Sequence, residues 1–175
     1  SLRIADPDSG AALAQGQVGV IEVKGPNVFT GYWRMPEKTA AEFRPDGFFI
    51  TGDLGKIDER GYVHIVGRAK DLIISGGFNV YPKEVESEID ALEGVIESAV
   101  IGLPHPDFGE GVTAVVVRKP GAAIDEFAIR EALEDRLAKF KQPKRVFFVE
   151  ALPRNAMGKV QKAALRQEYG TAYQG

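Results

Sequence analysis

The sequence contains no cysteine, and this absence excludes disulfide bonds, thiolate metal sites and a cysteine nucleophile. It has only two histidines, His64 and His105, so a histidine-rich metal site is not expected. No apolar run approaches the roughly 18 residues that a membrane-spanning helix needs. The net charge of −3 provides no basic excess for displacing counterions from phosphates, which argues against nucleic acid as the main partner. We therefore expect a cytoplasmic protein without a membrane span.

The first part of the chain is predicted to be rich in β-strands. Val18–Val23 is short, β-branched and mostly apolar, as is typical of a strand. Three further strands are predicted at residues 48–51, 54–57 and 62–66. Pro45-Asp46-Gly47 is a turn signal before the first of them, and Asp58–Gly61 is expected to form a hairpin loop between the last two. These features indicate a β-rich segment over residues 1–68.

After Arg68 the pattern becomes mixed. Pro82 suits the first turn of a helix whose apolar face is Val85, Ile89 and Leu92, and Gly94 is a typical stop signal. Strands are predicted at residues 98–103, 112–117 and 146–149, and further helices at 125–140 and 159–169. The fold class is therefore α+β, with a second domain over residues 69–175. Because ligand sites favour domain interfaces, this boundary is the first indication of function.

Four stretches of the chain carry a pattern that matters only in combination. They are Gly31-Tyr32-Trp33 with the following Pro36–Thr39, Thr51-Gly52-Asp53-Leu54, Gly67–Asp71 with Ser75–Glu86, and Pro153–Val160. In this order and spacing they resemble the adenylate-forming superfamily of acyl-CoA synthetases, luciferases and peptide-synthetase adenylation domains. The resemblance covers nearly the whole chain. It implies that residues 1–68 end a large domain and that residues 69–175 form a mobile small one.

The family reaction has two halves. A carboxylate attacks the α-phosphate of ATP and releases pyrophosphate, and the thiol of coenzyme A then attacks the acyl adenylate. Asp53 has two acceptor oxygens, which suit the two ribose hydroxyls of the nucleotide, although a turn aspartate explains the same residue. By resemblance, Arg68 makes a second contact with the ribose and Asn79 faces the phosphate during adenylation. The alternative for Arg68 is an ordinary surface arginine at the end of a strand.

Lys159 is the predicted catalytic residue. By resemblance its ammonium group bridges the substrate carboxylate and the α-phosphate as charge develops between them. The alternative is an ordinary surface lysine at the start of a helix. In the family this lysine is also an acetylation target, which implies a lysine acetyltransferase as a partner and loss of adenylation once the charge is removed.

Three further residues have roles implied by the resemblance. Lys70 matches the family's hinge, where the backbone turns the small domain between an adenylating and a thioester-forming pose. Gly76 and Gly77 lack Cβ atoms, so the pantetheine arm of coenzyme A is expected to pass close to their backbone, although a hairpin turn explains both. A lysine-rich cluster, residues 139, 141, 144 and 145, is interpreted as a solvated helix end rather than a binding site for coenzyme A phosphates.

The substrate is the least determined part of the prediction. Residues 77–88, 99–117 and 140–162 look particularly like bacterial malonyl-CoA synthetases, which implies malonate or methylmalonate. The acyl pocket, the phosphate-gripping loop and the ligands of Mg²⁺ are expected in a missing N-terminal part, so no metal ligand is assigned here. This chain alone is expected to be inactive. The alternatives are another acyl-CoA synthetase, a peptide-synthetase adenylation domain, and a non-catalytic binding module.

Overall fold

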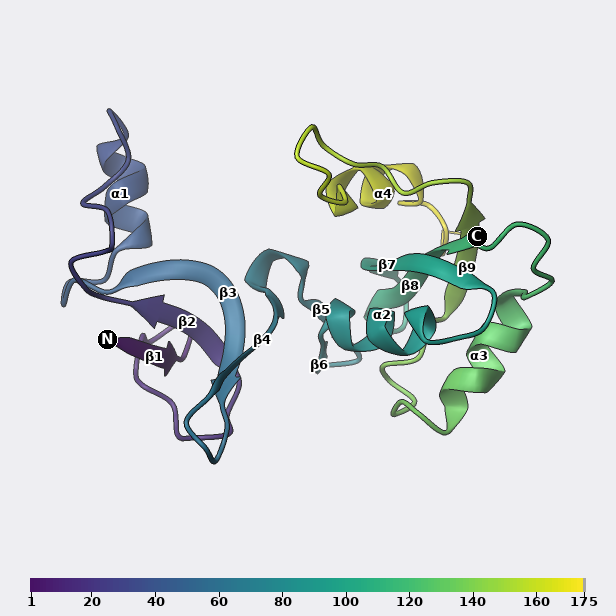
Figure 1. Ribbon diagram of the computed structural model, residues 1–175, viewed down its shortest axis with the longest axis horizontal. Helices are drawn as coiled ribbons and strands as arrows, with labels where there is room; N and C mark the ends of the chain where they lie inside the picture. The colour runs from purple at the N-terminus through teal and green to yellow at the C-terminus, as the bar shows by residue number, and fades with distance from the viewer. Residues whose placement is uncertain (175) are drawn as a thin grey trace. The chain divides into compact units, whose positions relative to one another are not determined.

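The computed structural model describes residues 1–174, and these form two compact units. Unit 1 comprises Ser1–Lys70, and unit 2 begins at Asp71 (Figure 1). The sequence-based division between residues 68 and 69 lies close to this position. Within the described residues, no helix has the length and apolar character needed to cross a bilayer.

Unit 1 is a four-stranded antiparallel sheet with strand order β1-β2-β3-β4. Its strands are β1 (Leu2–Ala5), β2 (Gly19–Val23), β3 (Phe49–Ile57) and β4 (Val63–Arg68), and one helix, α1 (Pro36–Glu42), precedes β3. The small core contains Ile4, Val20, Ile21 and Leu54. Glu22 is fully buried in β2, and it forms ion pairs with Arg3 at 2.7 Å and with Arg44 at 2.8 Å. A buried carboxylate needs such partners because desolvation is costly.

Unit 2 contains a five-stranded sheet in which β8 is central. The antiparallel strands are β5 (Ile73–Ser75), β6 (Phe78–Val80), β7 (Val95–His105) and β8 (Gly109–Arg118), and β9 (Arg145–Val149) pairs in parallel with β8. The short 3₁₀ segment η1 (Ala69–Asp71) leads into this sheet. Three helices accompany the strands: α2 (Pro82–Asp90), α3 (Glu126–Glu134) and α4 (Lys162–Glu168).

The sheet of unit 2 supports two separate hydrophobic cores. Val85 and Ile89 of α2 pack with Ile129 and Leu133 of α3 in one cluster that includes alternate residues of β7 and β8. Leu165 of α4 belongs to the other cluster, with Ala99, Ile101, Leu103, Val115, Val117 and Leu152. Neighbouring residues of a strand point to opposite faces, so both faces of this sheet are covered.

Two predicted helices are shorter in the structure than in the sequence-based prediction. The helix expected over residues 125–140 begins after the N-cap Asp125 and ends at Glu134. Leu137 still reaches the core, because the turn after α3 places its N–H 3.0 Å from the carbonyl of Leu133. The helix expected over residues 159–169 begins only at Lys162, because the preceding residues are hydrogen-bonded to Pro153 and Asn155.

Two of the strands predicted in unit 1 also differ from the structure. Residues 48–51 and 54–57 belong to the single strand β3, so the Thr51-Gly52-Asp53 segment is not a turn between two strands. The register of β3 shifts opposite Val20–Glu22 of β2, which is the irregularity that Gly52 accommodates. Strand β1 and helix α1 were not predicted from the sequence. Helix α1 has no buried residue, so it offers no apolar periodicity to detect.

Candidate functional site

Asp53 and Arg68 face each other across β3 and β4. They are direct partners in the register of these strands, and Nε of Arg68 lies 3.1 Å from Oδ1 of Asp53. The side chain of Asp53 is 30% exposed and that of Arg68 is 52% exposed. A pair this accessible contributes about 0–1 kcal/mol to stability. Both groups are therefore available to a ligand, and the structure brings together two of the predicted nucleotide-binding residues.

The backbone before Asp53 is held by Thr51. The Thr51 hydroxyl donates to the carbonyl of Ile21 at 2.8 Å and accepts the N–H of Asp53 at 3.1 Å. Gly52 between them has φ +74°, a conformation that other residues rarely adopt. A Cβ atom at Gly52 would lie 3.5 Å from Nη2 of Arg68. The Thr-Gly-Asp sequence thus turns the carboxylate toward Arg68 without a side chain intervening at residue 52.

Lys159 lies in a tight loop and not at the start of a helix. The Asn155 side chain accepts the N–H groups of Met157 and Lys159, each at 3.0 Å, and Asn155 N–H donates to the carbonyl of Lys159 at 3.0 Å. Gly158 has φ +77° and completes the turn. Lys159 is exposed. A surface lysine opening a helix is therefore not the arrangement found.

Arg154 closes the same loop from its other side. Its guanidinium group donates to the carbonyl of Gly158 at 2.6 Å and also pairs with Glu97 of β7. An isolated bridge joins Arg154 to Val160, and Gln161 N–H donates to Pro153 at 2.8 Å. Neither Arg154 nor Asn155 was given a role from the sequence. An asparagine three residues before a glycine is a turn signal that would have indicated the loop. We call residues 153–161 the Lys159 loop.

Gly76 and Gly77 form the turn of the β5–β6 hairpin. Their φ angles are +59° and +81°, so both central residues of this two-residue turn are in the left-handed region, as type I′ hairpins require. Gly76 N–H donates to the carbonyl of Phe108 at 2.9 Å. Phe78, the next residue, is 56% exposed and stacks on Phe140 at 4.7 Å between ring centroids. Hairpin geometry alone therefore explains both glycines.

Asn79 and Lys70 are both exposed. Asn79 pairs with Ile74 in the β5–β6 hairpin, two residues after the Gly-Gly turn. Lys70 lies in η1 and is the last residue of unit 1. Its position at the division of the chain is compatible with the implied hinge.

The predicted residues are distributed over several elements. Asp53, Arg68 and Lys70 belong to unit 1, whereas the other predicted residues belong to unit 2. In Figure 1 the Lys159 loop and the β5–β6 hairpin lie at different edges of unit 2. Across residues 1–174, no three His, Asp or Glu side chains are grouped so that they could hold a metal ion.

The lysine-rich cluster after α3 is engaged in contacts within unit 2. Lys141 pairs with Glu84 at 2.6 Å, and Nζ of Lys144 lies 5.2 Å from the centroid of the Phe108 ring. Desolvation by burial, followed by repulsion from Arg130 and Lys139, lowers the pKa of Lys144. The cluster is therefore not the solvated helix end expected from the sequence, because α3 ends at Glu134 and both Lys141 and Lys144 make contacts within unit 2.

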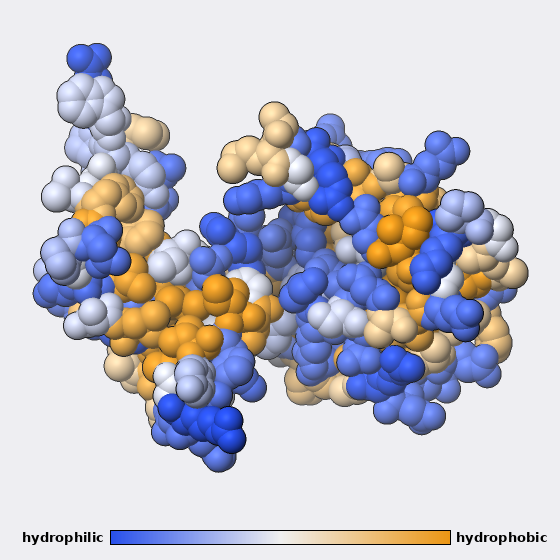
Figure 2. All heavy atoms as spheres, in the orientation of Figure 1, coloured by the Kyte–Doolittle hydropathy of each residue, from blue (hydrophilic) through white to orange (hydrophobic). Residues whose placement is uncertain are grey.

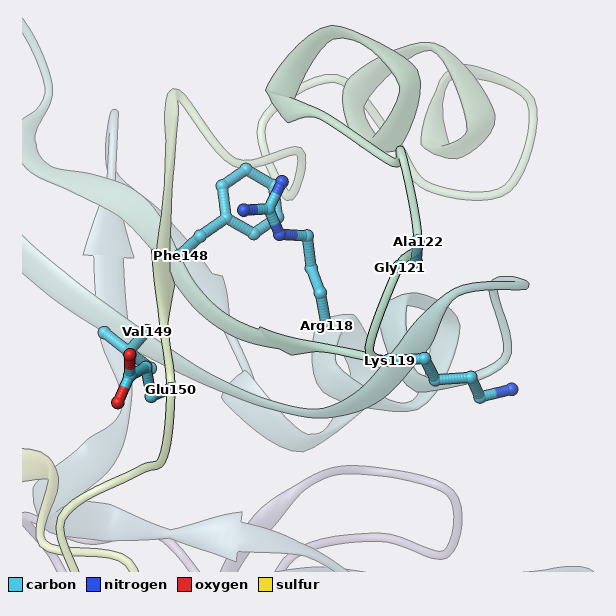
Figure 3. Close-up of a pocket in the computed structure, with 7 residues that line it drawn as sticks. All are labelled: Arg118, Lys119, Gly121, Ala122, Phe148, Val149 and Glu150. Carbon is cyan, nitrogen blue, oxygen red and sulfur yellow. The ribbon is translucent and has the colours of Figure 1, made fainter.

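A shallow pocket of about 320 Å³ opens between the end of β8 and β9 (Figure 3). The Arg118 guanidinium group lies over the Phe148 ring, 4.3 Å from its centroid, and donates to the Ile124 carbonyl at 3.3 Å. Lys119 points away from this ring (Figure 3). None of the residues proposed for the reaction lines this pocket.

Comparison with known proteins identifies relatives of this chain. Residues 84–159 match the family described as the AMP-binding enzyme C-terminal domain. A structure of ATP-bound MatB from Rhodopseudomonas palustris is 70% identical, with a TM-score of 0.95, and the match covers 99% of this chain and 34% of that one. A feruloyl-CoA synthase from Amycolatopsis is 47% identical over 97% of this chain and 34% of its own length.

A third relative is described as an amide bond synthetase and not as a CoA ligase. The structure of an amide bond synthetase, McbA from Marinactinospora thermotolerans, is 39% identical with a TM-score of 0.90, and the match covers 97% of this chain and 34% of that one. The chain thus spans about a third of the length of each of these relatives.

Proposed function

We propose that the chain is the C-terminal part of an ATP-dependent acid–CoA ligase, because residues 84–159 match the AMP-binding enzyme C-terminal domain. The proposal rests above all on 70% identity to ATP-bound MatB across 99% of this chain. The reaction forms an acyl adenylate and pyrophosphate first. The thiol of coenzyme A then displaces AMP to give the thioester.

In the proposed first half-reaction, unit 1 holds the nucleotide. Asp53 accepts hydrogen bonds from the ribose hydroxyls, and Arg68 both orients this carboxylate at 3.1 Å and contacts the ribose. Asn79 faces the phosphates. Lys159 stabilises the charge that develops as the substrate carboxylate attacks the α-phosphate. Magnesium, which neutralises phosphate charge in such reactions, is expected to bind residues outside this chain.

In the proposed second half-reaction, the backbone at Lys70 rotates unit 2 and replaces the Lys159 loop by the β5–β6 hairpin. This exchange is supported by the location of the two segments at different edges of unit 2 (Figure 1). The pantetheine arm can then approach the backbone of Gly76 and Gly77 closely, because neither residue has a Cβ atom. The two half-reactions would thereby use separate surfaces of one rigid unit.

The acid is proposed to be malonate or methylmalonate, on the resemblance of unit 2 to malonyl-CoA synthetases. A relative described as a feruloyl-CoA synthase is 47% identical over 97% of this chain. Similarity in this part of the protein therefore does not distinguish one acid substrate from another. Acid recognition is expected in the remaining two thirds of the protein. We also propose that the protein is cytoplasmic and that Lys159 is a target of acetylation.

The amide bond synthetase motivates a second candidate function. In that case an amine and not coenzyme A would attack the same acyl adenylate. The two functions share the first half-reaction and differ only in the acceptor. Product analysis with coenzyme A and with an amine, each added after adenylate formation, separates them.

The test is ATP–pyrophosphate exchange by the full-length parent protein with malonate, methylmalonate or acetate. Lys159→Ala is expected to lower the exchange rate about 100- to 1000-fold, because one preorganised charge is removed from the transition state. Lys119→Ala removes another exposed lysine of unit 2 and should leave the rate unchanged. Equal rates in both variants would contradict the catalytic role of Lys159. Exchange with none of the acids would reject the proposed substrates.

A further inference from the structure

Helix α4 immediately follows the Lys159 loop and has two charged side chains directed at the rest of unit 2. Lys162 forms an ion pair with Glu86 of α2 at 2.6 Å, and Arg166 forms one with Asp71 at 2.9 Å. These two positions are one helical turn apart, so they share a face of the helix. Leu165 between them is buried in the second core.

The two ion pairs connect α4 to different places. Glu86 also accepts the N–H of Val100 at 2.9 Å and is almost fully buried, so the Lys162 pair anchors α4 to the centre of unit 2. Asp71 is the first residue of unit 2 and follows Lys70 directly. Arg166 therefore joins the helix behind the Lys159 loop to the residue beside the proposed hinge, across 95 positions of sequence.

We infer that Asp71 and Arg166 form a positioning pair that fixes the Lys159 loop relative to the first residue of unit 2. The loop continues into α4 through Gln161, so a displacement of the helix displaces the loop. Rotation at Lys70 would then carry Lys159 as part of a rigid body. The catalytic consequence rests on the proposed function, whereas the mechanical connection does not.

A second observation separates this pair from an ordinary surface ion pair. The side chains of Arg166 and Asp71 are 31% and 16% exposed, compared with 45% and 38% for Arg136 and Glu88. The Arg136 pair has an N–O distance of 3.4 Å and does not involve α4 or the loop. Arg136→Gln is therefore the matched control, since it removes the same charge from the same unit.

The first experiment is amide hydrogen exchange on the 175-residue chain, which needs no catalytic activity. Arg166→Gln is expected to accelerate exchange at the Lys159 and Gln161 amides about two- to fivefold, while amides of β7 and β8 stay unchanged. Asp71→Asn should do the same, and the double variant should add nothing further, because both substitutions remove one interaction. Unchanged exchange in Arg166→Gln, as in Arg136→Gln, would overturn the inference.

The second experiment measures acyl-adenylate formation in the full-length parent. Arg166→Gln is expected to lower kcat about tenfold without changing the KM for ATP, because the loop is misplaced while the nucleotide contacts in unit 1 remain. Arg166→Lys should recover part of the rate. A kcat equal to that of Arg136→Gln would reject the positioning role. If the wild-type parent forms no adenylate at all, the proposed function fails, and the exchange experiment still decides whether the pair holds the loop.

Discussion

The two units differ in how their sheets are covered. In unit 2, helices α2 and α3 contribute to one hydrophobic core and α4 to another, so both sheet faces are buried. In unit 1, Tyr62, Val63 and Ile65 at β4 are 65%, 39% and 68% exposed, and apolar side chains gather on its surface in Figure 2. A sheet that has both faces covered by helices buries its apolar side chains within one domain. An exposed apolar face, in contrast, is typical of a surface that another domain or protein covers. From this difference we propose that unit 2 folds by itself and that unit 1 is part of a larger domain.

The largest effect is expected from a substitution in the core of unit 2. Leu133→Ala removes a fully buried side chain of α3 and should lower the free energy of unfolding of unit 2 by about 2–5 kcal/mol. Phe127→Ala on the same helix replaces a side chain that is 72% exposed, so it should change stability by less than about 0.5 kcal/mol. Urea unfolding followed by circular dichroism measures both. Simultaneous loss of amide protection in β2 and β3 would show that the units do not fold separately.

A smaller effect is expected at the bare face of unit 1, and its size should depend on what surrounds it. Ile65→Thr should leave the stability of the 175-residue chain nearly unchanged, because Ile65 is 68% exposed there. In the full-length parent the same substitution should destabilise by about 1–2 kcal/mol, since a covering domain would bury this side chain. Thermal unfolding of the two proteins with and without the substitution gives the comparison. Equal, negligible shifts would mean that nothing covers β4.

The smallest effect concerns the loop between β3 and β4. A hydrogen bond from His64, at 2.7 Å from Oδ2, and a further one from Tyr62 N–H lower the pKa of Asp58 below its ordinary value of 3.8. A lowered carboxyl pKa in the folded state means that the interaction stabilises the loop above about pH 4 and is lost as pH falls through the folded pKa. His64→Leu should therefore raise the pKa of Asp58, as measured by NMR titration. His105→Leu in unit 2 is the control, and an unchanged pKa in His64→Leu would contradict the assignment.

Apolar periodicity predicted burial better than it predicted helix length. Val85 and Ile89 are buried in α2 as expected, and the Asp125 cap begins α3. Beyond Glu134 the same spacing reaches Leu137, which is buried in a turn after the helix has ended. An i, i+4 pattern reports which residues face the core, and a turn can satisfy it as well as a helix can.

The candidate site was accessible from sequence only through motifs. The resemblance selected Asp53, Arg68 and Lys159, but the pairing of Asp53 with Arg68 depends on strand register, which no local pattern specifies. The link between Asp71 and Arg166 joins residues 95 positions apart, so local sequence gives no signal for it. Long-range contacts of this kind follow from the packing of α4 on the sheet, which only the structure provides.

The construction of the Lys159 loop separates the shape of the segment from the chemistry of its side chain. In the described residues, Asn155 holds the backbone of Lys159 and Arg154 holds the carbonyl of Gly158, so the hydrogen bonds that shape the loop do not use the ammonium group of Lys159. Lys159 is exposed, and its amine does not take part in the hydrogen bonds of this turn. A covalent group placed on this nitrogen and later removed would therefore change the charge at one point while leaving the hydrogen bonds that shape the loop in place.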